Sequence, residues 1–268
     1  MVDKDYINKQ LDAINKRKYS VAKSNNIIQQ TATNLTLNEQ RFVLIALSKI
    51  QKGDEADKEY KITIDDFCDI LNIDKTTGGY LKPRLKKYLK KLSDNSIWYY
   101  DSNTREDKLI RWFTGVRIGR GIITYRFDPS VVPYIYNLKE YYTTYELWCI
   151  LLLKTKNSIE MYEFLKSLAN LRIAPVFEIE VLQAKFNVNY STYAEFKRSF
   201  LLKTIEEVND KTDLSVEFVE IKEGRKVTKL EFIINVLKNK EFENQYWAVE
   251  SAIQNKQLLK SKLEIDEL

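Results

Sequence analysis

The strongest constraint on the fold of this 268-residue chain is an order of helix and strand signals that occurs twice. Apolar residues recur at helical spacing over residues 37–50, residues 60–64 alternate as a short strand, and a helix continues to Leu71. A turn at residues 76–79 then leads into a second amphipathic helix from Tyr80. Three strand-like runs follow, at residues 97–100, 110–118 and 122–127.

The second half repeats this order with little identity between single residues. Its helical segments lie at residues 145–154, 158–171, 181–186 and 191–208, and its strand-like segments at residues 177–179, 214–221 and 226–234. In each half a helix, a turn and a second helix precede a hairpin, which is the arrangement of a helix-turn-helix with a β-wing. The sequence therefore predicts an α+β fold of two tandem winged-helix domains related by internal duplication.

Only seven Gly and four Pro occur in the chain, so long flexible linkers between these units are not expected. We expect four segments: an N-terminal appendage at residues 1–25, a first domain at 26–140, a second domain at 141–237 and a charged C-terminal tail at 238–268.

Local signals mark where several helices begin. Thr36 followed by Glu39 predicts a capping box, and Asp65 or Asp66 is expected to cap the next helix. Pro83 is acceptable only in the first turn of the basic helix. The long helix of the second half carries one apolar face, formed by Phe196, Phe200, Leu201, Thr204, Ile205 and Val208.

The composition excludes several classes of enzyme. The chain has no His, so it has no Ser-His-Asp or Cys-His nucleophile system and no His-rich metal motif of a nicking enzyme. Its glycines do not form a phosphate-binding loop. Two Cys residues, Cys68 and Cys149, are too few for a zinc site made of Cys alone and are expected to be core residues. We expect a protein that is not an enzyme and has no cofactor and no metal.

The chain is also expected to reside in the cytoplasm. Its first 18 residues are charged throughout and hold no apolar run of signal-peptide length. The longest apolar stretch, near residues 147–153, is far shorter than the ~20 residues that span a bilayer. The low Cys count fits a reducing compartment, and no membrane partner is expected.

The densest positive charge lies between Lys75 and Leu92. This segment contains no acidic residue, although the whole chain has a formal net charge of only +5. Solvated helix faces normally mix charge signs, and Lys pairs at spacing four repel one another, so an anionic partner is the favoured explanation. The predicted phosphate contacts are Lys82, Arg84, Lys86, Lys87, Lys90 and Lys91, with Lys75 just before them.

A second basic helix carries Tyr193, Lys197, Arg198 and Lys203. Taken alone it is an ordinary helix face. However, the helix after the turn of a helix-turn-helix enters the major groove of DNA, where Arg and Lys read guanine edges. The hairpin after it would present Arg225 and Lys226, beside Lys222 and Gly224, at the tip of a wing.

Aromatic residues are numerous, and Trp98, Tyr99 and Tyr100 form a consecutive run. Such a run could stack on the bases of single-stranded nucleic acid. Because the residues lie in a strand that alternates in polarity, core packing is the favoured interpretation.

Three long passages give the chain a resemblance to a known family. They read SNNIIQQTATNLTLNEQRFVLIAL, YYTTYELWCILLLKTKNSIEMYEFL and FKRSFLLKTIEEVNDKTDLSVEFVEIKEGRKVTKLEF. From about Val21 to Ile234 the chain resembles the theta-type plasmid replication initiators, the iteron-binding family with two winged-helix domains. The resemblance implies binding of double-stranded direct repeats at a plasmid origin, local opening of the duplex, and recruitment of the host initiator and replicative helicase.

The resemblance also implies roles for the two domains. The second domain would supply most base-specific contacts, through Lys197 and Arg198 in its recognition helix and Arg225 and Lys226 in its wing. The Lys-rich helix of the first domain, residues 82–91, would clamp the DNA backbone. The first domain would also form a dimer that represses the promoter of the initiator gene and limits plasmid copy number, whereas monomers bind the repeats.

The sequence departs from the family pattern at two positions. Ser199 stands where related chains often carry a basic residue, and Glu160 stands where Arg is common. Two other functions remain open at this point. A transcriptional repressor with the same fold would bind an operator without opening an origin, and an interaction scaffold would use the basic helix to meet an acidic protein.

Overall fold

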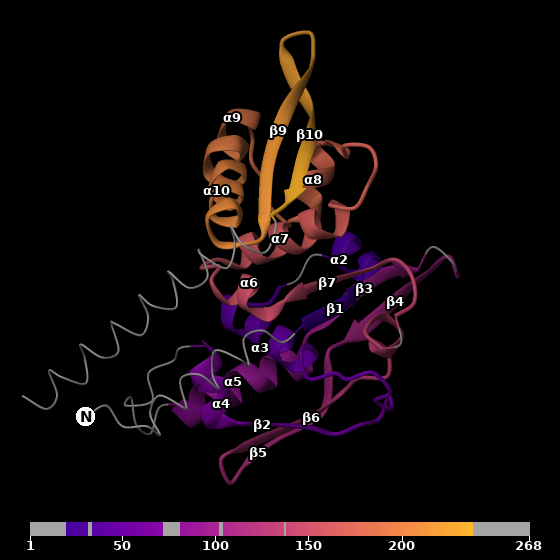
Figure 1. The fold of residues 1–268 in the computed structure, drawn as a ribbon, viewed down its shortest axis with the longest axis vertical. Coiled ribbons are helices and arrows are strands. Elements are labelled where there is room, and N and C mark those ends of the chain that lie inside the picture. Colours follow the sequence, from indigo (N-terminus) through magenta and orange to yellow (C-terminus); the bar gives the residue numbers. More distant parts are fainter. Residues whose placement is uncertain (1–19, 32–33, 72–80, 102–103, 137, 238–268) are drawn as a thin grey trace, which may run out of the picture.

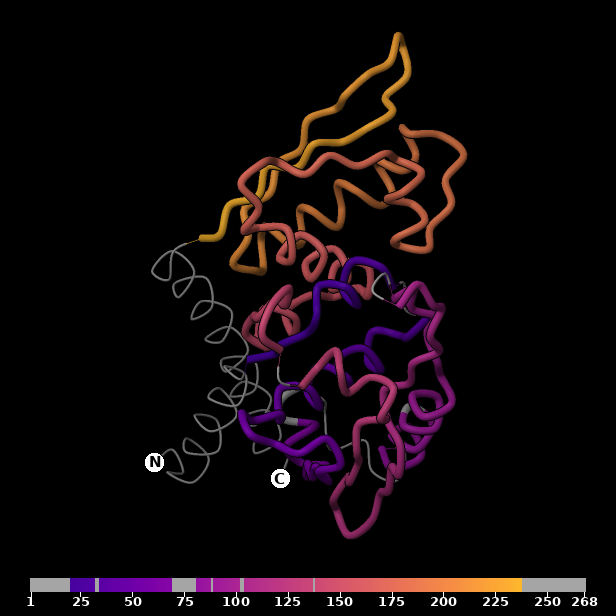
Figure 2. Tube along the Cα trace, turned by 90° about the vertical axis from the view of Figure 1, so that its right-hand side faces the viewer, coloured from indigo at the N-terminus to yellow at the C-terminus, as the bar shows by residue number. Residues whose placement is uncertain are grey.

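The computed structural model describes residues 20–31, 34–71, 81–101, 104–136 and 138–237. These residues form two halves, one stacked on the other, and each half carries a projecting β-hairpin (Figures 1 and 2). One continuous hydrophobic core runs through both halves.

The first half has the predicted order of elements. These are α3 (Leu37–Leu47), β2 (Tyr60–Thr63), α4 (Ile64–Leu71), α5 (Leu81–Asp94), β5 (Phe113–Gly119) and β6 (Ile122–Phe127). The short strand β2 pairs with β6, and β6 pairs with β5, so the sheet order is β2-β6-β5. The β5–β6 hairpin is the wing of this half.

The second half repeats the arrangement. Its elements are α7 (Lys156–Leu168), β8 (Val176–Glu178), α8 (Ile179–Lys185), α9 (Tyr193–Phe196), η3 (Lys197–Leu201), α10 (Leu202–Lys211), β9 (Leu214–Glu223) and β10 (Lys226–Val236). Its sheet order, β8-β10-β9, matches that of the first half strand for strand. The predicted α+β fold with two winged helices is confirmed.

Two elements that the sequence analysis missed close the first half. β1 (Ser20–Ser24) pairs antiparallel with β7 (Tyr142–Glu146), and α2 (Asn25–Gln30) follows β1 directly. Residues 20–25, expected within the N-terminal appendage, therefore belong to the folded body. The helix expected from residue 145 begins only at α6 (Leu147–Leu151), because the alternating aromatic and β-branched residues before it extend as a strand.

The strand-like run at residues 110–118 is split between two sheets. β4 (Glu106–Arg111) pairs with β3 (Ser96–Asp101), whereas Phe113 begins β5. Trp112 lies between them and is buried. Of the aromatic run expected to pack in the core, only Tyr99 is buried. Trp98 and Tyr100 are 65% and 48% exposed, on the outer face of the β3–β4 ribbon, so the prediction of core packing is wrong for these two residues.

The predicted helix starts are confirmed in α3 and corrected in α4. The Thr36 side chain accepts a hydrogen bond from the Glu39 amide, and Glu39 accepts one from the Thr36 amide at 2.7 Å, which completes the capping box. In α4 the Thr63 hydroxyl accepts from the Asp66 amide, so Thr63 caps the helix instead of Asp65 or Asp66. The helix begins at Ile64, two residues before the start that a cap at Asp65 would give and three before the start that a cap at Asp66 would give, which places both carboxylates inside its first turn.

Helix α7 joins the two halves. Ten of its thirteen residues are buried, including polar residues that would face solvent on a surface helix. It packs against α2 and β7 of the first half and against α10 of the second. Cys68 and Cys149 are buried as predicted, and burial raises the pKa of the Cys149 thiol.

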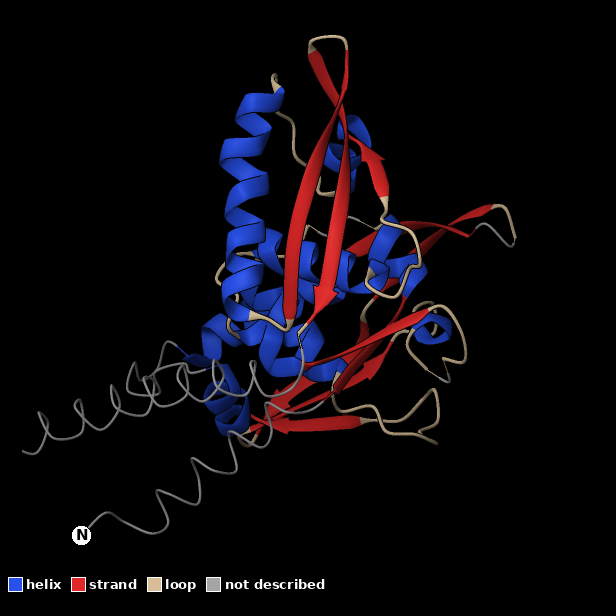
Figure 3. Cartoon of the chain, turned by 45° about the horizontal axis from the view of Figure 1, so that its top comes forward, coloured by secondary structure: helices blue, strands red, loops and turns tan. Residues whose placement is uncertain are grey.

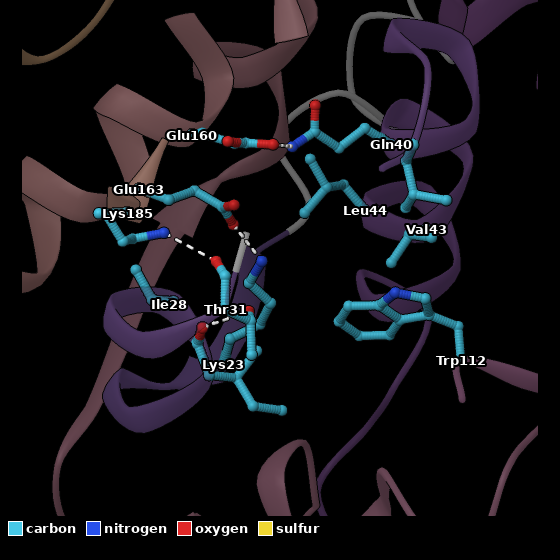
Figure 4. A pocket seen from close by; sticks show the side chains of 12 residues that line it. Lys23, Ile28, Thr31, Gln40, Val43, Leu44, Trp112, Glu160, Glu163 and Lys185 are labelled. Carbon is cyan, nitrogen blue, oxygen red and sulfur yellow. Dashed lines mark hydrogen bonds and ion pairs between the residues drawn. The ribbon is translucent and has the colours of Figure 1, made fainter. Parts of the chain in front are cut away.

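Charged side chains are buried where the halves meet (Figure 4). The Lys23 ammonium lies 2.6 Å from Glu163 of α7, and both side chains are less than a tenth exposed. The Tyr145 hydroxyl donates to the same carboxylate. From the second half, Lys185 donates to the Thr31 carbonyl at 2.8 Å, and burial lowers the pKa of Lys185 to about 8.

Lys23, Thr31, Glu163 and Lys185 border a cavity of about 20 Å³. That volume holds no more than a single water molecule. Glu160 lines this cavity and accepts from the Gln40 side-chain amide at 3.4 Å. The junction is therefore a packed polar contact between the halves and not a pocket for a small molecule.

Glu163→Gln is expected to destabilise the protein by about 3 kcal/mol, because it leaves the buried Lys23 ammonium without its carboxylate. Asp94→Asn is a matched control, since it breaks the exposed Lys90–Asp94 pair and should change stability by about 0.5 kcal/mol or less. Urea unfolding of both variants measures the difference. Equal losses would show that the buried pair contributes no more to stability than an exposed one.

Candidate nucleic-acid interface

The first basic helix, α5, has one buried face and one charged face. Leu85, Leu89 and Leu92 are buried against the core of the first half. The six cations predicted as phosphate contacts are all exposed on the remaining surface of the helix: Lys82, Arg84, Lys86, Lys87, Lys90 and Lys91. The prediction for Lys75 lies outside the described residues.

Two of the six cations are held by carboxylates within the protein. Lys91 lies 2.8 Å from Glu39, whose side chain is only 3% exposed and also caps α3. Lys90 pairs with Asp94 one turn later in the same helix. Within the described part of the chain, no ion-pair partner is found for the other four. Lys91 thus holds α5 against the start of α3, and the unpaired cations form the surface available to an anion.

Arginines of the first wing were not predicted as candidates. Arg117 and Arg126 lie on β5 and β6 within 2.5 Å and 3.7 Å of Glu59, and Arg120 lies exposed in the turn between the strands with a φ of 49°. Their position in a wing is the signal that could have identified them. The sequence prediction named basic residues only at the tip of the second wing.

The second basic helix is continuous through α9, η3 and α10, and it runs beside the β9–β10 hairpin (Figure 3). Thr192 caps its start by accepting from the Glu195 amide at 3.2 Å. Its middle is a π-helical turn, in which the Leu202 amide donates to the Lys197 carbonyl five residues back. The Thr204 hydroxyl donates to the carbonyls of Phe200 and Leu201 at 2.9 and 3.0 Å, which stabilises the end of this turn.

The π-turn explains how the helix keeps its apolar face. Phe196 and Leu201 are both fully buried although they are five residues apart, which in an α-helix at about 100° per residue would separate them by about 140°. The wider turn brings them toward one side. The ring centre of Phe200 lies 5.4 Å from that of Phe196, on which it stacks, and 5.1 Å from that of Phe186 at the C-terminal end of α8. The two helices of the unit therefore share an aromatic core. All six residues of the predicted apolar face are buried.

The predicted DNA contacts of this helix divide into two groups. Arg198 and Lys203 are exposed, and the described residues offer neither of them a carboxylate. In contrast, Lys197 and Tyr193 both donate to one oxygen of Glu220 on β9, each at 2.7 Å. The Lys197 ammonium also lies 5.9 Å from the centre of the Phe218 ring. The helix and its wing are therefore linked by a carboxylate.

The second wing ends in a tight turn at Gly224 and Arg225. Gly224 has a φ of 63°, in the left-handed region that glycine adopts without strain. Arg225 and Lys226 are exposed there, as predicted. Lys226 approaches Glu180 only to 3.8 Å, and both side chains are more than 70% exposed, so its ammonium remains available to a partner.

Among the described residues, no three potential metal-binding side chains gather at one place. The same residues contain no helix long and apolar enough to cross a membrane.

Comparison with known proteins places the two units in one family. The family model described as "Initiator Replication protein, WH1" matches residues 20–166, and the model described as "Initiator Rep protein, WH2" matches residues 178–234. The chain belongs to this family of replication initiators. Its first matched region includes both β1 and β7, in agreement with their pairing across the closure of the first half.

Two curated relatives come from Escherichia coli. The initiator is 26% identical over 227 residues to an uncharacterized 27.6 kDa protein, covering 78% of this chain and 92% of that one. It is also 26% identical over 244 residues to a protein named PI protein, covering 77% and 80% of the two chains. A crystal structure of Pi initiator protein in complex with iteron DNA has the same fold, with a TM-score of 0.69, 22% identity and coverage of 84% of this chain and 99% of the solved one.

Two lysines of α5 should behave differently when each is replaced by methionine. Lys91→Met is expected to destabilise the initiator by about 1–2 kcal/mol, because the buried Glu39 carboxylate loses its cation. Lys86→Met should change stability by about 0.5 kcal/mol or less, since Lys86 is exposed and has no carboxylate partner among the described residues. Urea unfolding measures both values, and similar losses would contradict the structural role assigned to Lys91.

Proposed function

We propose that this protein is a non-enzymatic, cytoplasmic initiator of plasmid replication that binds repeated sites in duplex DNA. The observation that carries the proposal is the presence of two exposed basic helices, each in the second position of a helix-turn-helix and each followed by a basic wing. The relative crystallised with iteron DNA supports repeats of this kind as the binding sites. The expected absence of a cofactor and a metal remains part of the proposal.

The charged face of α5 suits contact with DNA phosphates. Within the described residues, four of its cations have no carboxylate partner, and they are closely spaced and exposed: Lys82, Arg84, Lys86 and Lys87. Such a cluster neutralises phosphates and releases counterions whatever the base sequence. In the view of Figure 1, α5 and the α9–α10 helix both lie on the left of the molecule. We infer that one duplex meets both. We assign to the first unit the sequence-independent part of the affinity for DNA and the positioning of the protein along the duplex.

Arg198 is the best candidate for reading bases. It is exposed, lies in the π-turn of the second helix and has no described carboxylate as a partner. Its planar guanidinium can donate two parallel hydrogen bonds to O6 and N7 of guanine, which is the commonest specific contact in the major groove. Lys203, Arg225 and Lys226 would hold the backbone on either side.

The exposed face of the β3–β4 ribbon supports self-association through the first domain. Trp98 lies opposite Leu109 in the strand register, and both are exposed, as is Tyr100 on the same face. Large apolar side chains gathered on one surface are typical of a protein contact. We propose that this face serves the monomer–dimer equilibrium, by which the dimer represses the initiator's own promoter and limits copy number. Recruitment of the host initiator and replicative helicase completes the function.

Footprinting on a supercoiled plasmid that carries the gene and its flanking DNA tests the proposal. We expect protection of several direct repeats of about 20 base pairs, roughly two helical turns. Permanganate reactivity is expected to appear in an adjacent A·T-rich stretch as the duplex opens. Protection without opening would favour a repressor, and a lack of salt-dependent duplex binding would favour a protein scaffold.

Arg198→Ala and Lys86→Ala should separate base reading from phosphate contact. Arg198→Ala is expected to cost about 1–3 kcal/mol on the duplex that the wild type enriches from a random library, and little on random-sequence duplex. Lys86→Ala should weaken both and reduce the slope of log K against log salt by about one. Fluorescence anisotropy across a salt series measures these changes.

Arg172→Ala is the control for the loss of an exposed arginine, because Arg172 lies in the loop after α7, outside both basic helices. It should leave binding to both duplexes unchanged. Equal losses on selected and random duplex for Arg198→Ala would contradict its role in base reading.

A further inference from the structure

Glu220 occupies a position in the second wing where the strand pattern calls for an apolar residue. Along β9 the inward positions are Leu214, Val216 and Phe218, followed by Glu220. Glu220 lies directly opposite Leu230 of β10, which is fully buried, so the two side chains share the inner face of the hairpin. A carboxylate on this face is costly unless it is paired and hydrogen-bonded.

Its partners are on the recognition helix. The Oε1 atom of Glu220 accepts from the Lys197 ammonium and from the Tyr193 hydroxyl, each at 2.7 Å. The hydrogen bond from Lys197 is the main cause of a lowered pKa for the Glu220 carboxyl, so this side chain is ionised at neutral pH. Burial and the hydrogen bond to Glu220 raise the pKa of the Tyr193 phenol. The helix and the wing therefore share a fixed negative charge.

This charge lies beside the side chains that would meet DNA. Lys197 is the residue directly before Arg198, and its side chain is 38% exposed, so a phosphate could reach it. A phosphate that approached would have to replace an existing carboxylate. The exchange of one anion for another brings little net gain, whereas a free lysine at the same place would release a counterion.

We propose that Glu220 is a specificity-determining residue that withholds Lys197 from DNA phosphates. The inference rests on the proposed DNA-binding function. By neutralising Lys197, Glu220 lowers the affinity of the recognition helix for any duplex, and it leaves Arg198 as the cation that engages bases. Glu220 also fixes the angle between the helix and the wing through Tyr193. Lys197 is then a residue that positions the wing and not a phosphate contact.

Glu220→Gln tests this role with little change in shape, since the amide oxygen can still accept from Tyr193. Binding of a 30-base-pair duplex of random sequence is expected to tighten about threefold to tenfold at ~0.1 M salt. The slope of log K against log salt should become steeper by about 0.9, the value for one additional phosphate contact. Binding of the selected duplex should change less, so the ratio of selected to random affinity falls.

Glu217→Gln is the matched control. Glu217 lies on the same strand, but it is exposed on the face of the hairpin opposite to that of Glu220. Its replacement removes the same charge without releasing Lys197, so the salt slope should stay at the wild-type value. Identical effects of Glu220→Gln and Glu217→Gln, or weaker random binding by Glu220→Gln, would overturn the proposal.

Lys197→Met gives a second test that does not depend on the stability of the Glu220 variant. If Glu220 withholds Lys197, then Lys197→Met leaves the salt slope on random duplex unchanged, and adding Glu220→Gln to it no longer steepens the slope. If Lys197→Met reduces the slope of log K against log salt by about one, Lys197 contacts a phosphate. That result would overturn the role of Glu220 but leave the proposed DNA-binding function intact. Wild-type protein without salt-dependent duplex binding would overturn the proposed function as well.

Discussion

The buried ion pair between Lys23 and Glu163 is the constraint that holds β1 against α7, the helix on which both units pack. Two charges held out of water stabilise a protein only while they remain together, because either one alone would be buried without compensation. Lys23 belongs to β1 at the closure of the first half, and Glu163 belongs to the helix that joins the halves. Lys185 adds a third buried cation, anchored on Thr31 from the side of the second half. Contacts made by residues of neither basic helix therefore hold the second unit against the first.

The cations of this protein serve two purposes, and geometry separates them. Lys91, Lys197 and Lys23 are bound to carboxylates that cap a helix, link a wing or close the junction. Arg198 and Lys86 are exposed and unpaired within the described residues. A net charge of +5 conceals this division, since it counts paired and free cations alike. Within the described residues, the cations proposed to meet DNA lie on the two basic helices and at the tip of the second wing.

Much of the fold was predictable because its signals are local. The capping box of α3, the short strands, the apolar face of the recognition helix and the duplicated order all follow from spacing within one segment. The β1–β7 pair was missed because its strands are more than a hundred residues apart and neither has a turn signal beside it. The exposure of Trp98 depends on what covers the ribbon, which strand alternation does not encode. The basic residues of the site could be named from position, whereas the pairing of Lys197 with Glu220 is visible only once β9 lies against the helix.

The π-turn in the recognition helix bears on how such a protein could change its DNA target over evolutionary time. Phe196 and Leu201 are five residues apart and both reach the core because the turn accommodates one residue more than an α-helix. Loss of one residue between them would leave a spacing of four, which suits an ordinary α-helix and the same core. The residues before the turn would then shift by about 1.5 Å along the helix axis relative to those after it. This helix can therefore vary in length by one residue and present its leading side chains to different base steps while its hydrophobic anchor stays in place.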